Sequence, residues 1–127
     1  MNQLQILAAP VGRVLLASLF LLAGLQKIGA YEGTAGYMAS QGVPGALLPL
    51  VIGLEVLGAA AVIVGWQTRA VALLLAGFSL ASAVLFHFKP DDALQMTMFL
   101  KNVSIAGGFL LLVAHGAGAY SLDHRRG

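Results

Sequence analysis

The sequence predicts an all-α membrane protein that folds as an antiparallel bundle of four transmembrane helices. Its 127 residues are 59% hydrophobic and only 9% charged, whereas soluble domains are about 45–50% apolar and about 25% charged. The apolar residues also fall into four long runs, separated by polar or glycine-rich connections. Since a chain of this length suffices for one domain, we expect residues 1–127 to form a single four-helix domain.

The first apolar run predicts a helix over about residues 10–28. Pro10 suits the first turn of a helix, where its missing N–H is not needed. The run is just long enough to span a bilayer, which takes about 20 mostly apolar residues. We expect Arg13 to extend toward the membrane interface, and Gln26 and Lys27 to close the helix at the opposite interface, with Lys27 as an anchor.

The connection that follows is long and rich in glycine. Tyr31 and Tyr37 are amphipathic rings of the kind found at the level of the lipid headgroups. We expect residues 34–40 to form a short interfacial helix, and Pro44 to precede the second span.

Three further runs predict helices over about residues 46–65, 69–88 and 95–114. Thr68 is expected to be the N-cap of the third helix, since threonine is a favoured capping residue. The chain then ends in a glycine-rich, polar and basic tail, which we expect to be solvated.

The distribution of basic residues predicts the orientation. In a four-helix bundle with short connections both termini lie on one side of the membrane. That side is expected to hold Arg13, Arg69, Arg125 and Arg126, and the other side Lys27 and Lys89. Because the side richer in Arg and Lys is normally cytoplasmic, we expect cytoplasmic N- and C-termini.

One carboxylate, Glu55, lies near the middle of the second run. Other polar residues are expected in the same, outer half of the bundle: Gln26, Lys27, His87, Lys101 and Asn102. An unpaired charge at the membrane centre costs about 2.5–3.5 kcal/mol or more, so such residues normally face the interior and pair.

Two interpretations of these polar residues remain open. In the first, Glu55 pairs with Lys101, helped by Asn102, and fixes the register of the second and fourth helices. In the second, the residues line a pocket for the headgroup of a quinone, another flat amphiphile or a lipid. The ring oxygens would then lie near Lys101, Asn102 or His87, and the tail among Leu and Phe side chains.

The composition also excludes several classes of function. There is no cysteine, so the chain has no disulfide, thiolate metal site or thiol relay of its own. No basic block of the kind that binds nucleic acid is present. The three histidines, His87, His115 and His124, lie at different depths and do not form a closed metal site.

The chain resembles the DoxX family of small bacterial inner-membrane proteins, most closely its short, stand-alone enterobacterial-type members. The resemblance covers nearly the whole chain in order. The matching segments are residues 12–13, 23–27, 37–44, 54–55, 65–69, 86–87, 99–102, 107–108 and 116–123, which read GR, AGLQK, YMASQGVP, LE, GWQTR, FH, FLKN, GG and GAGAYSLD.

The resemblance implies a four-helix, multi-pass protein of the bacterial inner membrane. The family is named after a subunit associated with a thiosulfate:quinone oxidoreductase, and a mycobacterial relative is linked to a membrane complex with superoxide dismutase and a sulfurtransferase. The resemblance to the family does not identify any catalytic residue in this chain. The lack of cysteine argues against thiosulfate chemistry through a persulfide on this chain.

The polar residues and the resemblance together favour a quinone- or redox-associated membrane subunit, with quinone as the expected ligand and a redox enzyme as the expected partner. Whether the chain itself belongs to a quinone-linked oxidoreductase stays open. One alternative is a non-enzymatic scaffold or assembly partner in oxidative-stress defence. Another is a small carrier of amphiphilic molecules, which would need a homo-oligomer because four helices leave little room for an aqueous path.

Overall fold

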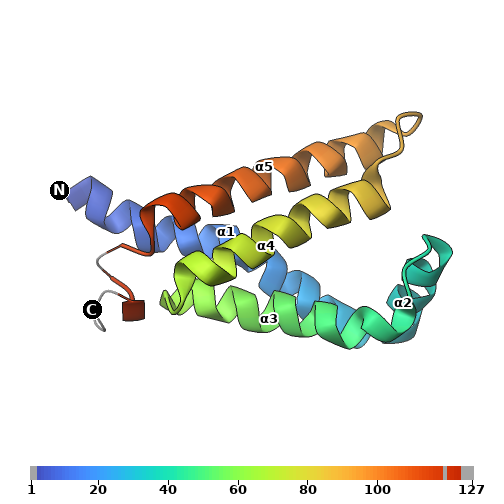
Figure 1. Cartoon of the computed structure of the whole chain (residues 1–127), viewed down its shortest axis with the longest axis horizontal. Helices are drawn as coiled ribbons and strands as arrows, with labels where there is room; N and C mark the ends of the chain where they lie inside the picture. The colour runs from blue at the N-terminus through green and yellow to red at the C-terminus, as the bar shows by residue number, and fades with distance from the viewer. Residues whose placement is uncertain (1–2, 119, 124–127) are drawn as a thin grey trace.

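A computed structural model describes residues 3–118 and 120–123 (Figure 1). The basic residues Arg125 and Arg126, and His124, lie outside these residues. The elements are α1 (Gln3–Gly29), α2 (Tyr31–Ser40), a 3-10 turn η1 (Gly45–Leu47), α3 (Leu48–Val64), α4 (Thr68–Ser82), a π-helical turn η2 (Ala83–His87) and α5 (Ala93–His115).

Four helical segments are long and apolar enough to cross a membrane: Ile6–Gly29, Gly45–Val64, Thr68–His87 and Ala93–His115. The predicted four-helix membrane bundle is therefore confirmed. The short helix expected over residues 34–40 is also present, as α2.

The helices pack mainly as two pairs, α1 against α3 and α4 against α5, with α3 joining the pairs by packing on α4. Figure 1 shows α4 and α5 side by side as a hairpin, and α2 at the end of the bundle where α1 finishes. The start of α1, the α3–α4 turn and residues 120–123 lie at the opposite end. The molecule therefore has two distinct ends, one carrying α2 and the other the C-terminal segment.

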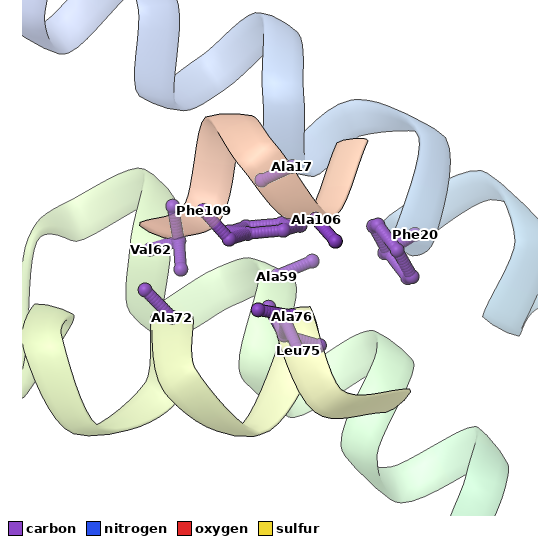
Figure 2. Close-up of a cluster of buried hydrophobic side chains, with 9 residues drawn as sticks. All are labelled: Ala17, Phe20, Ala59, Val62, Ala72, Leu75, Ala76, Ala106 and Phe109. Atoms are coloured by element: carbon purple, nitrogen blue, oxygen red, sulfur yellow. The ribbon is translucent and has the colours of Figure 1, made fainter. Parts of the chain in front are cut away.

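The core lies where the four long helices meet (Figure 2). It is built mostly from small residues and two aromatic rings: Ala17, Phe20, Ala59, Val62, Ala72, Leu75, Ala76, Ala106 and Phe109. The rings of Phe20 and Phe109 meet edge to face, with centroids 5.4 Å apart. Alanines at these positions let the helix backbones approach closely, which is how helices associate in lipid.

Helix α1 begins at Gln3, so the prediction that it starts at Pro10 was wrong. Pro10 lies inside the helix and removes one N–H from the hydrogen-bond ladder. The mostly apolar residues before it nevertheless continue the helix, because backbone groups in lipid have no water to bind.

The turn between α3 and α4 is fixed by the helix end itself. Gly65 has φ 75° and ψ 39° at the C-cap of α3. Its N–H donates to the carbonyl of Val62, and the N–H of Trp66 donates to that of Ala61. This pair of bonds is a Schellman motif, which ends a helix with glycine in the left-handed region.

Arg13 is buried against this turn, with only 1% of its surface exposed. Its guanidinium donates to the carbonyls of Val62 and Ile63, at 2.9 Å each, and also to the carbonyl of Tyr120. The expectation that Arg13 extends to the interface was therefore wrong. The last carbonyls of α3 lack partners within the helix and carry partial negative charge, so they attract a cation from the neighbouring α1.

Asp123 caps α4 from the C-terminal segment. Its two carboxylate oxygens accept from the backbone N–H groups of Gln67 and Thr68, at 2.7 and 2.8 Å. The predicted N-cap role of Thr68 was wrong, because Thr68 is the first residue of the helix and is itself buried. The prediction of a solvated tail was wrong in part: Tyr120 is exposed, but Ser121 is buried and the backbone N–H of Asp123 donates to the carbonyl of Gly65.

Candidate functional site

A cavity of about 260 Å³ lies at the end of the bundle that carries α2. Residues from all five α-helices and from η2 line it: Leu19, Phe20, Ala23, Lys27, Thr34, Tyr37, Met38, Val51, Glu55, Phe78, Ser79, Ser82, Phe86, His87, Met98, Lys101 and Asn102. Most of the wall is apolar, with a small number of polar groups. Such a wall is typical of a small-molecule site, although the volume lies just below the usual range of about 300–1,000 Å³.

Four of the five candidate residues predicted from the sequence line this cavity: Glu55, His87, Lys101 and Asn102. The fifth, Gln26, is exposed and is not among the lining residues. Sequence reasoning did not single out Tyr37 and Ser82 as lining residues, and treated Lys27 as an interface anchor.

The partner of Glu55 is Lys27 on α1. The Nζ of Lys27 lies 2.8 Å from Oε1 of Glu55, and the Glu55 side chain is only 4% exposed. The predicted pairing of Glu55 with Lys101 was therefore wrong, as was the assignment of Lys27 as a plain interface anchor.

The packing of α1 on α3 explains this choice of partner. Gly24 lies against α3 so closely that an added Cβ would come within 3.2 Å of Glu55 Cβ and 3.3 Å of the Val56 backbone nitrogen. Lys27 follows Gly24 by three residues, and residues three apart lie on the same helix face. Lys101 instead lies on α5, which packs mainly against α4.

Two polar side chains on α5 remain available to a ligand. Lys101 makes no hydrogen bond or ion pair with any residue that the structure describes, and it is exposed. Asn102, its neighbour, is half-buried. Both side chains line the cavity, and an ammonium and a carboxamide each offer N–H donors to an oxygen of a bound molecule.

His87 lies on the π-helical turn η2, between α4 and α5. Its Nδ1 lies 2.7 Å from Oε1 of Gln95. In the neutral tautomer that carries its proton on Nδ1, the ring donates to this oxygen and Nε2 is an acceptor.

Helix α2 closes one side of the cavity. Tyr37 stacks on Phe86 with ring centroids 5.7 Å apart, and its hydroxyl donates to the carbonyl of Phe86 at 3.3 Å. Nearby, Nζ of Lys89 donates to Oε1 of Gln41 at 3.2 Å. These contacts connect α2 and the segment after it to the end of the α4–α5 hairpin.

The arrangement can hold the oxygens of a flat or branched headgroup and keep its apolar part among aromatic and methionine side chains. Within the described residues, no three His, Asp or Glu side chains gather as a metal-binding group. The polar side chains of the cavity can bind a ligand through hydrogen bonds and charge. They are Lys101, Asn102, His87 and the ion pair of Lys27 with Glu55.

Comparisons with known proteins agree with the fold. The chain is 48% identical over 123 residues to the inner membrane protein YqjF of Escherichia coli (strain K12), covering 97% of this chain and 95% of the relative. It is 40% identical over 122 residues to the inner membrane protein YphA of the same organism, covering 91% and 87%. No solved structure matches the chain significantly. The DoxX family profile matches residues 8–88, and the chain belongs to the DoxX family.

Proposed function

We propose that this chain is a multi-pass protein of the bacterial inner membrane whose cavity binds the headgroup of a quinone, and that it serves as a membrane subunit beside a redox enzyme. The names of the two relatives and the four apolar spans support the membrane assignment. In the orientation that the basic residues predict, the cavity belongs to the outer half of the bundle, and both termini are cytoplasmic.

The observation that carries the quinone proposal is the meeting of Lys101, Asn102 and His87 in one cavity with apolar walls. Lys101 and Asn102 can donate hydrogen bonds, as a quinone carbonyl requires, and in the tautomer protonated on Nδ1 the Nε2 of His87 can accept, as a quinol hydroxyl requires. The rings of Phe20, Phe78 and Phe86 also line the cavity. A volume of about 260 Å³ fits a headgroup better than a whole lipid, so the tail would leave between helices.

Photolabelling with a short-chain azidoquinone, in nanodiscs, tests this proposal. We expect labelled peptides from η2 and the first half of α5, and we expect excess unlabelled quinone to suppress that labelling. Lys101→Met and Asn102→Leu should each reduce it several-fold, while Arg69→Gln, at the opposite end of the bundle, should not. Labelling that is spread over lipid-facing residues and is insensitive to competitor would overturn the proposal and favour a scaffold role.

A further inference from the structure

The charged groups of the cavity do not balance. Three charged side chains line it: Lys27, Glu55 and Lys101. Lys27 and Glu55 form a contact of 2.8 Å and neutralise each other. The cavity therefore holds one excess positive charge, on Lys101.

No carboxylate elsewhere in the described chain compensates this charge. Glu32 on α2 and Asp91 are exposed and do not line the cavity. Asp92 accepts from the backbone N–H of Gln95 as the N-cap of α5. Asp123 lies at the opposite end of the bundle, in the C-terminal segment, where its carboxylate caps the start of α4.

Lys101 lies well inside a membrane span. It follows Ala93, the first residue of α5, by eight positions, which corresponds to about 12 Å along the helix axis. A lysine at this depth is costly unless an anion accompanies it or its side chain extends to the interface. An anion bound between Lys101 and Asn102 would also receive charge-assisted hydrogen bonds, which are stronger than neutral ones.

We infer that the cavity selects an anionic ligand, namely an amphiphile whose ring or headgroup carries one negative charge on oxygen, placed against Lys101. This inference rests on the proposed quinone-binding function and specifies the charge of the ligand. It predicts that an acidic quinone binds better than a neutral quinone of the same shape.

Two naphthoquinones provide a matched pair of probes. 2-Hydroxy-1,4-naphthoquinone is ionised at neutral pH, whereas 2-methoxy-1,4-naphthoquinone has no acidic proton. Each is titrated against the azidoquinone label on the full chain in nanodiscs of neutral lipid, which avoids a background of surface charge. We expect the hydroxy compound to compete at least about tenfold better, a difference of about 1.4 kcal/mol.

The variants assign the preference to one side chain. Lys101→Met should abolish the preference, so that the two compounds compete equally with the remaining label, while Lys101→Arg should retain the preference. Equal competition by both compounds in the wild type, or a preference that survives in Lys101→Met, would overturn the inference and leave the quinone site standing. Failure of both compounds to compete would overturn the quinone site together with the inference.

Discussion

Lys27 and Glu55 form an ion pair between the end of α1 and the middle of α3, with 2.8 Å between Nζ and Oε1. The carboxylate side chain is 4% exposed and the lysine side chain 27% exposed. The pair thus joins two helices in the membrane at the wall of the cavity.

Removing one member of this pair should destabilise the fold. Lys27→Met leaves the Glu55 carboxylate buried without its cation, which should cost about 3 kcal/mol. The double variant Lys27→Met/Glu55→Gln removes both charges and should recover most of the loss. Thermal unfolding in detergent or nanodiscs measures both effects.

Lys101→Met is the matched control for that experiment, because it makes the same change at a lysine without a partner among the described residues. Its unfolding midpoint should remain near that of the wild type. A midpoint for Lys27→Met equal to that of Lys101→Met would contradict a stabilising role for the pair.

Close contact between α1 and α3 depends on Gly24. An added Cβ would meet Cγ2 of Val56 at 2.5 Å as well as the Cβ of Glu55. Neither neighbour is the far end of a flexible side chain, so the helices must separate. Gly24→Ala should therefore lower the free energy of unfolding by about 1–3 kcal/mol, the usual cost of overpacking.

Gly12 on the same helix provides the comparison, because a Cβ there has no heavy atom within 4 Å. Gly12→Ala should leave stability unchanged or raise it, since alanine favours the helix by up to about 1 kcal/mol. If both substitutions behaved alike, the close approach of α1 and α3 at Gly24 would have to be abandoned.

The number, order and approximate bounds of the spans could be predicted from the sequence, because apolar runs of this length have few alternatives to membrane helices. The sequence also predicted that four of the cavity residues lie in the same half of the bundle, since the depth of a residue follows from its place along a helix. Helix pairing could not be derived in this way. Depth along the helix axis favours Lys101 as the partner of Glu55, since Lys27 lies only two residues from the end of α1. The packing of α1 on α3 nevertheless brings Lys27 to Glu55.

The C-terminal segment shows a second limit. A tail reading GAGAYSLD has neither helical periodicity nor an apolar run, so the sequence suggests a solvated end. The segment is held by contacts with the end of α3 and the start of α4, where backbone carbonyl and N–H groups lack partners within the helix. Every helix has such groups, so they do not distinguish this site in the sequence. The sequence alone did not distinguish Asp123 from a carboxylate such as Asp91, which is exposed.

Arg13 connects α1, the end of α3 and the C-terminal segment through a single guanidinium. Arg13→Lys keeps the charge but replaces a planar fork of donors by one ammonium group, which cannot reach all three carbonyls in the same geometry. Burial makes the lost bonds costly, and we expect about 2–3 kcal/mol of destabilisation. Arg69→Lys, at the exposed arginine of α4, is the control and should change the unfolding midpoint little. Equal midpoints for the two variants would argue against the role of Arg13.

Tyr37 should control how often α2 opens away from the cavity. Its ring stacks on Phe86 and its hydroxyl donates to the carbonyl of the same residue. Tyr37→Ala loses both contacts, and the sum of a ring pair and one hydrogen bond is worth about 1–3 kcal/mol. Amide hydrogen exchange within Tyr31–Ser40 should therefore become about tenfold faster or more, since about 1.4 kcal/mol corresponds to a factor of ten.

Two further variants separate the contributions to this closure. Tyr37→Phe keeps the ring and should accelerate exchange by less than Tyr37→Ala, since it removes only the hydroxyl bond. Tyr31→Ala removes a ring from the same helix that forms no hydrogen bond or ring contact with the described residues, and should have a much smaller effect on α2. Exchange in α4 should stay slow in all three variants, because the core that holds α4 does not include α2. Unchanged exchange of α2 in Tyr37→Ala would mean that other contacts, such as that of Lys89 with Gln41, hold the helix in place.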